Sequence, residues 1–334
     1  MRSTSLLCLL IAAGALGCGA AAGPAVNAPQ VNVPALAEIK VGQPPILLAL
    51  AADGSRLYAT GDDGKLVVID TSSNQVLASF DVPPNSVAVA VSPDGRRVYV
   101  SNLFGNTLTV LDTTKPALLP ALTLVAQFRR GGYGRMAISP DGSKAYVVNR
   151  ANEAFLIVDL NSGQADVKMM DMRPVDVALT PSGDSALICG CKDFCVPGTC
   201  EPFDAAQGLF GGYLSVGGSP YRVVIDSRGV RAFVAALADS TVTIVDLVRR
   251  ESTAKLTVPV QPTGLALSSD GGTAYVASQT SGTVTAIDAA SASVRAIVRV
   301  AEEAREIVVM PDGARAYVST KTGVIAIDTR AFGN

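Results

Sequence analysis

The sequence predicts an all-β protein, and a repeated pattern is the main reason. One unit recurs along most of the 334 residues: a short aliphatic run, a turn ending in glycine, a run centred on tyrosine or alanine, and a run closing on aspartate. The clearest copy spans 87–95, 98–102 and 107–112. The turn glycines, spaced 41 to 47 residues apart, are Gly54, Gly95, Gly142, Gly183, Gly229, Gly271 and Gly313. Seven units of about 40 residues, each with several short strands, predict a seven-bladed β-propeller with four-stranded blades.

The two ends of the repeated region predict how the ring closes. A fourth strand follows the closing aspartate of earlier units, as in 75–80 after Asp70, but only six residues follow Asp328 in the last unit. The segment 36–41 precedes the first unit, and its exit resembles the chain after a normal fourth strand. We therefore expect this segment to be the outer strand of the seventh blade, which would also cover a sheet edge. A single propeller domain is predicted for 34–334.

The turns account for several recurrent residues. In the motif Ser92-Pro-Asp-Gly95, proline supplies a φ near −65° and glycine supplies the positive φ that a tight hairpin requires. The aspartates that close the third strands are expected to accept hydrogen bonds from the turns that follow them, and not to form an acidic ring. These aspartates are Asp70, Asp112, Asp159, Asp204, Asp246, Asp288 and Asp328.

Composition argues against nucleic-acid binding. The formal net charge is −2 and the chain has no tryptophan, with 5% aromatic residues. It therefore lacks both the basic surface and the stacking platforms that such proteins use. The mean hydropathy of +0.35 is high for a soluble protein. It is expected where neighbouring blades bury both faces of each sheet.

The N-terminal residues predict export and lipid attachment. Residues 1–18 combine a basic start, a short apolar run and the sequence Ala15-Leu16-Gly17-Cys18, which resembles a bacterial lipobox. Cys18 would carry the lipid, 19–33 would form a flexible tether, and Gly19 favours the outer membrane over inner-membrane retention. Lipoboxes usually have leucine where this chain has Ala15. The alternative is cleavage near 20–22, which would leave a secreted or periplasmic protein.

The absence of histidine restricts the chemistry that the chain can perform. It excludes Ser-His-Asp and Cys-His catalysis, imidazole base catalysis and histidine-ligated haem or copper. A carboxylate site for calcium or another divalent ion remains open, but the repeats show no convergent set of acidic residues. No cofactor is predicted.

Four cysteines lie together in the fourth unit, at Cys189, Cys191, Cys195 and Cys200. This unit has about four more residues between its turn glycine and closing aspartate than most others, which predicts a cysteine-rich loop at 189–200. In an exported protein an even number of cysteines indicates two disulfides, with three pairings open. Pairing of Cys191 with Cys200 is favoured as a hairpin staple. A four-cysteine zinc site is the alternative, although the spacing fits it poorly.

A ring of positions at the channel mouth provides the candidate binding site. The residues seven before each turn glycine should begin the innermost strands, and they are Leu47, Ala88, Arg135, Asp176, Arg222, Gly264 and Glu306. Charges here, with Arg305 beside Glu306, predict a pocket for a polar or anionic ligand. The alternative is a set of neutralising ion pairs, Arg135 with Asp176, and Arg222 or Arg305 with a neighbouring acid. Loop residues that could extend either arrangement are Asn102, Asn149, Arg150, Asp62 and Asp63.

The second strands carry a family resemblance. The motifs Tyr99-Val-Ser-Asn102, Tyr146-Val-Val-Asn149, Tyr275-Val-Ala-Ser278 and Tyr317-Val-Ser-Thr320 resemble the YVTN-type β-propeller repeats. The resemblance covers nearly the whole chain after the leader. It implies a propeller of the kind found in bacterial and archaeal surface and periplasmic proteins, a group with diverse functions. The Gly-His and Trp-Asp signatures of WD-repeat propellers are absent.

Together these observations predict a lipid-anchored cell-envelope protein that acts as a non-enzymatic binding or scaffolding module. Its partner would be an envelope protein or a small polar or anionic ligand, and it would contact the membrane only through its lipid. One alternative is a metal-assisted hydrolase of lactone type, with a divalent ion in the central channel and sensitivity to EDTA. Another is a structural component of a surface layer, for which self-assembly would be the sign.

Overall fold

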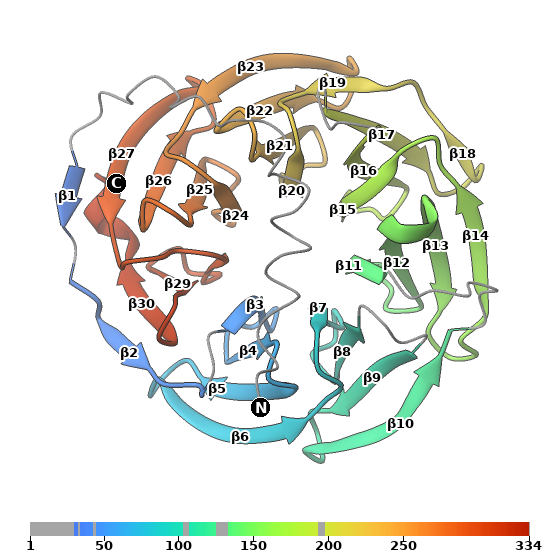
Figure 1. Ribbon diagram of the computed structural model, residues 1–334, viewed down its shortest axis with the longest axis horizontal. Coiled ribbons are helices and arrows are strands. Elements are labelled where there is room, and N and C mark those ends of the chain that lie inside the picture. Colours follow the sequence, from blue (N-terminus) through green and yellow to red (C-terminus); the bar gives the residue numbers. More distant parts are fainter. Residues whose placement is uncertain are drawn as a thin grey trace, which may run out of the picture.

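The computed structural model describes residues 30–32, 34–42, 45–102, 107–124, 133–192 and 198–333. Seven sheets stand around a central axis, as Figure 1 shows, and this confirms the predicted all-β propeller. Blade 1 contains β3 (Pro45–Leu50), β4 (Arg56–Gly61), β5 (Lys65–Asp70) and β6 (Gln75–Asp81). Blade 2 contains β7 (Ser86–Val91), β8 (Arg97–Asn102), β9 (Thr107–Asp112) and β10 (Ala117–Thr123). Blade 3 contains β11 (Tyr133–Ile138), β12 (Lys144–Asn149), β13 (Ala154–Asp159) and β14 (Ala165–Met169).

The next three blades follow the same order from the axis outward. Blade 4 contains β15 (Arg173–Leu179), β16 (Ser185–Cys191), β17 (Gly198–Asp204) and β18 (Leu209–Phe210), and β19 (Leu214–Val216) also pairs with β17. Blade 5 contains β20 (Pro220–Ile225), β21 (Arg231–Ala236), β22 (Thr241–Asp246) and β23 (Glu251–Thr257). Blade 6 contains β24 (Pro262–Leu267), β25 (Thr273–Ser278), β26 (Thr283–Asp288) and β27 (Ser293–Arg299). Consecutive strands within each blade are antiparallel.

The seventh blade joins the two ends of the chain. It contains β28 (Ile307–Val309), β29 (Arg315–Ser319), β30 (Val324–Asp328) and, as its outer strand, β2 (Ala37–Ile39). β2 runs antiparallel to β30, with Ala37 opposite Ala326. The predicted closure by an N-terminal strand is confirmed.

A short strand lies in the segment expected to be a tether. β1 (Gln30–Asn32) pairs in parallel with β27 and becomes the fifth strand of blade 6. The predicted signal peptide, Cys18 and the rest of the tether lie outside the described residues. Within the part of the chain that the structure describes, no helix is long and apolar enough to cross a membrane.

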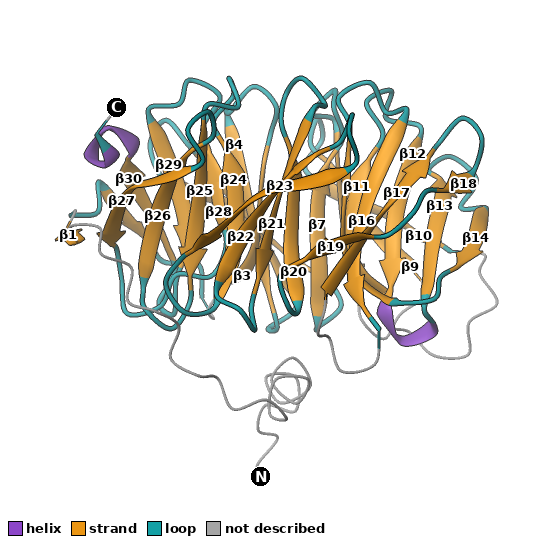
Figure 2. Ribbon diagram, turned by 90° about the horizontal axis from the view of Figure 1, so that it is seen from above, coloured by secondary structure: helices purple, strands orange, loops and turns teal. Residues whose placement is uncertain are grey.

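The ring has two faces, which we call the mouth face and the turn face. Strands alternate in direction, so the loops between second and third strands leave on the same face as the entrances to the inner strands. This mouth face carries the 3-10 helix η1 (Arg150–Asn152), and the opposite turn face carries η2 (Thr329–Phe332), as Figure 2 shows.

The core lies between neighbouring blades. The tyrosines of the second strands are almost fully buried, at Tyr58, Tyr99, Tyr146, Tyr275 and Tyr317. The hydroxyl of Tyr317 donates to the backbone oxygen of Thr71 at 3.1 Å and to Asn74 Oδ1 at 2.8 Å. Because Thr71 and Asn74 belong to blade 1, this contact also stabilises the junction at which the ring closes.

The closing aspartates have the structural role that the sequence predicts. Asp246 Oδ1 accepts the backbone N–H groups of Val248 at 2.9 Å and Arg249 at 2.8 Å. The other six make the same kind of bond to the turn that follows them. Hydrogen bonds from the side chain and the backbone N–H of Thr114 hold the pKa of Asp112 below its usual range. These carboxylates are therefore engaged in their turns.

Three of the four clustered cysteines, Cys189, Cys191 and Cys200, lie in strands and not in a loop on the mouth face. A disulfide joins Cys189 on β16 to Cys200 on β17, and both residues are buried between blades 4 and 5. The favoured pairing of Cys191 with Cys200 is therefore wrong. The strand register places Cys200 opposite Cys189, whereas Cys191 faces Gly198. Cys191 is also disulfide-bonded, and Cys195 lies outside the described residues.

Loss of this disulfide should destabilise the propeller. Replacing Cys189 and Cys200 by alanine opens a crosslink between residues 11 apart, which should lower the free energy of unfolding by about 3 kcal/mol. Urea denaturation in non-reducing buffer measures the difference. In reducing buffer the wild type and the variant should agree to within about 1 kcal/mol. Equal stability under non-reducing conditions would contradict the assigned pairing.

Candidate functional site

Irregularities in the inner strands position the residues of the channel mouth. The register with the second strand shifts near the mouth end of β3, β7, β11, β15, β20 and β24. In β15 the shift falls between Pro174 and Asp176, and in β20 between Pro220 and Arg222. A β-bulge of this kind bends the strand and changes the direction of nearby side chains. Proline is tolerated there because the ladder is already interrupted.

Four of the predicted site residues meet in one charge network. Arg135 Nη1 donates to Glu306 Oε2 at 2.8 Å, and Arg222 Nη1 donates to Asp176 Oδ2 at 3.0 Å. Arg222 Nε lies 3.4 Å from Glu306 Oε1, which links the two pairs. The residues come from blades 3, 4, 5 and 7, and blades 3 and 7 are not neighbours in the ring (Figure 1). We call these four residues the channel network.

The network is buried and electrically balanced. The side chains of Asp176 and Glu306 are each 1% exposed, whereas those of Arg135 and Arg222 are 13% and 22% exposed. Asp176 also accepts the backbone N–H groups of Val177 and Val223, both at 2.9 Å. Two arginines and two carboxylates give a net charge of zero, and the carboxylates are held by several donors. Buried charges persist when they are paired and hydrogen-bonded in this way.

The electrostatic balance is clearest at Arg135. Burial is the largest single influence and lowers the pKa of its guanidinium, but the combined attraction of Glu306, Asp176 and Tyr221 raises the pKa above its ordinary value. Arg135 therefore stays charged at every pH at which the fold is expected to persist. The predicted partner was Asp176, and the direct ion pair is instead with Glu306.

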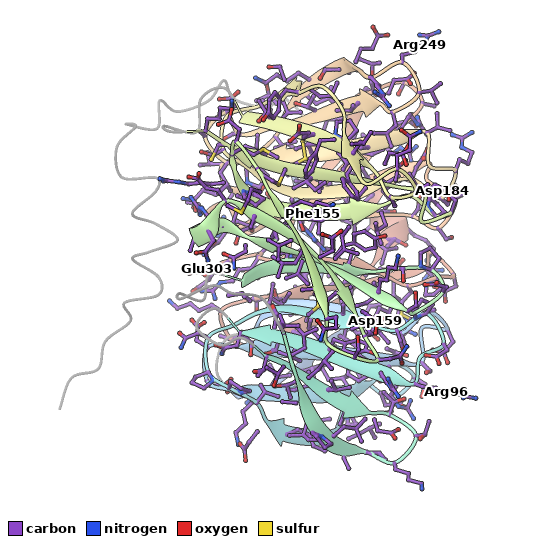
Figure 3. The ribbon with its side chains drawn as sticks, turned by 90° about the vertical axis from the view of Figure 1, so that its right-hand side faces the viewer. Arg96, Phe155, Asp159, Asp184, Arg249 and Glu303 are labelled. Atoms are coloured by element: carbon purple, nitrogen blue, oxygen red, sulfur yellow. A yellow bond between two sulfur atoms is a disulfide. The ribbon has the colours of Figure 1, made fainter. Side chains whose placement is uncertain are left out.

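Arg305 does not join the channel network. Its Nη2 and Nε donate to Glu303 Oε2 at 2.8 and 3.0 Å. Figure 3 shows Glu303 on the mouth side of the ring. Nearby, burial raises the pKa of Asp62. The positive charge of Arg305 partly offsets this rise, and the negative charge of Asp63 adds to it. The fifth predicted residue thus belongs to a separate group on blades 7 and 1.

Sequence reasoning missed two residues at the mouth. Tyr221 immediately precedes Arg222, and its ring centroid lies 5.5 Å from Arg135 Cζ, a cation–π distance. Arg173 begins β15, with its Nε 3.4 Å from Glu153 Oε1 just after η1. Tyr221 could have been found from its position in the irregular segment at the start of the inner strand β20. Arg173 was missed because it precedes Asp176, the position of β15 that lies seven residues before the turn glycine.

The channel carboxylates do not suit a divalent ion. No group of three or more potential metal-ligating residues occurs in the described ranges. Asp176 and Glu306 are each bound to an arginine. A divalent ion beside them would have to displace these guanidinium groups and would then face two positive charges. The donor set therefore does not fit the channel metal that a lactone hydrolase of this fold would need.

Comparison with known proteins extends only to the fold. No family model matches the chain, and no curated protein matches its sequence. Among solved structures, a chain of hydrazine synthase from Kuenenia stuttgartiensis superimposes with a TM-score of 0.74 at 18% identity, covering 88% of this chain and 98% of its own. The β-propeller domain of Cps50 (Swd1) from Myceliophteria thermophila gives a TM-score of 0.74 at 14% identity, covering 87% and 98%. At such low identity these likenesses show a shared β-propeller fold, which is compatible with a binding or scaffolding module.

Proposed function

We propose that this protein is an exported lipoprotein of the bacterial cell envelope that acts as a non-enzymatic binding module through its mouth face. The YVTN-type motifs and the lipobox ending at Cys18 support the envelope location. The observation that carries the binding role is the channel network. Its four charged groups are bound to one another across the axis, so they form a fixed floor beneath the mouth.

A channel network whose charged groups are already paired with one another suits recognition better than catalysis. A general acid or base must exchange a proton with a substrate, but Asp176 and Glu306 are almost fully buried and already engaged. Partners would instead contact the loops around the mouth, which the rigid blades hold in place. No observation favours the hydrolase or the surface-layer alternative.

Photo-cross-linking from the two faces tests the binding role. A photoreactive amino acid replaces Ala151 on η1 or Ala314 after the turn glycine Gly313, in the full-length protein in intact cells. Both alanines are exposed, and they lie on opposite faces, so they form a matched pair. We expect a reproducible adduct from position 151 and none from 314. Equal labelling from both positions, or labelling from 314 alone, would refute a mouth-face binding role.

The anchor has its own test. We expect Cys18→Ala to move the protein from the membrane fraction to the soluble fraction and to abolish the incorporation of labelled palmitate. A variant that stays in the membrane fraction and still incorporates palmitate would contradict lipidation at Cys18.

A further inference from the structure

One arginine at the mouth, Arg150, has no counter-charge among the residues that the structure describes. Arg150 begins η1, which packs against the inner strands β11 and β15. Arg150 makes no ion pair or hydrogen bond with any described residue, whereas Arg135, Arg173, Arg222 and Arg305 each contact an acid. A cation held on a short, packed turn without a partner is an available donor for an anion.

The neighbours of Arg150 add to the positive charge. Arg150 is an exposed residue. The groups around its guanidinium nevertheless desolvate it and lower its pKa, repulsion from Arg173 lowers the pKa further, and Tyr221 opposes the change. Tyr221 also lies against Arg135. Tyr221 thus lies near both Arg135 and Arg150, and Arg173 lies near Arg150. We call Arg135, Arg150, Arg173 and Tyr221 the arginine cluster. The acids that form ion pairs with it are Glu153, 3.4 Å from Arg173, and Glu306, which is shared with Arg222.

A second donor without an acceptor lies in the same turn. Asn149 is the N-cap of η1 and is fully buried, and its Oδ1 accepts the backbone N–H of Asn152 at 3.2 Å. Its Nδ2 has no hydrogen-bond partner among the described residues. The equivalent residue of blade 2, Asn102, donates its Nδ2 to the backbone oxygen of Pro84. An unsatisfied buried donor in a native fold calls for an explanation, and Asn149 immediately precedes Arg150 in the same turn.

We propose that the arginine cluster binds a small anionic group, a carboxylate or a phosphate, with Arg150 as its main ligand. This inference rests on the proposed function and names the ligand chemistry of the mouth. A guanidinium offers paired N–H donors that match two oxygens of such a group. Arg173 adds a second positive charge, and Tyr221 lies near Arg135 and Arg150. Binding at Arg150 breaks no existing ion pair, so the channel network remains intact beneath the ligand.

Calorimetric titration of the full-length protein in a non-ionic detergent and low-chloride buffer tests this site. The probes are citrate and inorganic phosphate. The variant is Arg150→Gln, and the matched control is Arg249→Gln, an exposed arginine on the turn face (Figure 3) with the same change of charge. We expect the wild type to bind at least one probe. Arg150→Gln should weaken that binding by about tenfold or more, and Arg249→Gln by less than about twofold.

Either of two results overturns the site: binding of neither probe by the wild type, or equal weakening by the two substitutions. Cross-linking from position 151 needs no added anion, so the proposed function is tested independently of this site. If citrate binds and also suppresses the adduct at 151, the anionic group belongs to the partner. If citrate binds and leaves the adduct unchanged, the natural ligand is a free anion. Both of these results support the site.

Discussion

Replacement of Arg222 by methionine should lower the free energy of unfolding by about 3–5 kcal/mol at neutral pH. Arg222 contacts both Asp176 and Glu306, whose side chains are each 1% exposed. Without it, two buried carboxylates share a single arginine, Arg135. Because methionine fills a similar volume, the decrease in the free energy of unfolding reflects mainly the uncompensated negative charge. Urea denaturation monitored by circular dichroism measures the difference from the wild type.

A control variant with the same change of charge separates this cause from a general effect of losing an arginine. Arg249→Met, on the exposed turn face, should change stability by no more than about 0.5 kcal/mol. A loss below about 1 kcal/mol for Arg222→Met would contradict the structural role of the network.

This expectation changes how the mouth can be tested. The sequence alone suggests that alanine at Arg135 and Arg222 would abolish ligand binding and leave the fold intact. The structure predicts instead that such variants unfold more easily, because each removes a counter-charge from a buried acid. Arg150 has no such partner in the part of the chain that the structure describes, so it is the better residue for separating binding from stability.

Phe155→Ala should have an effect of similar size, for a different reason. Phe155 is fully buried at the interface of blades 3 and 4. Its ring centroid lies 5.2 Å from that of Phe203, 5.8 Å from that of Tyr146 and 6.3 Å from that of Phe210. Truncation removes these aromatic contacts and leaves a cavity, so we expect a loss of about 3–5 kcal/mol in the free energy of unfolding.

The matched control for this prediction is Met169→Ala on β14, the next strand of the same blade. Met169 is 64% exposed, so its truncation should change stability by about 0.5 kcal/mol or less. Both variants are compared by urea denaturation in the oxidised protein. Similar losses for the two would show that the aromatic cluster does not hold blades 3 and 4 together.

Most residues of the site could be predicted from the sequence, but the ion pairs between them could not. Counting back from the turn glycines placed Arg135, Asp176, Arg222 and Glu306 at one mouth, since each repeat presents the same position to the axis. It also placed Arg305 there, and that side chain instead pairs with Glu303. The partner of Arg135 depends on which side chain crosses the channel, and no local pattern encodes this.

The sequence by itself determined the seven blades, the closure through 36–41 and the role of the closing aspartates. These features depend on short-range patterns: alternation within a strand, turn residues at fixed offsets, and repetition. Only the tertiary structure decided the partner of Cys200 and the bond between Arg135 and Glu306, 171 residues apart. It also left Arg150 without an ion pair among the described residues. The physical reason is that strand register and ring curvature bring distant residues together, and the pairing of side chains then depends on distance and burial.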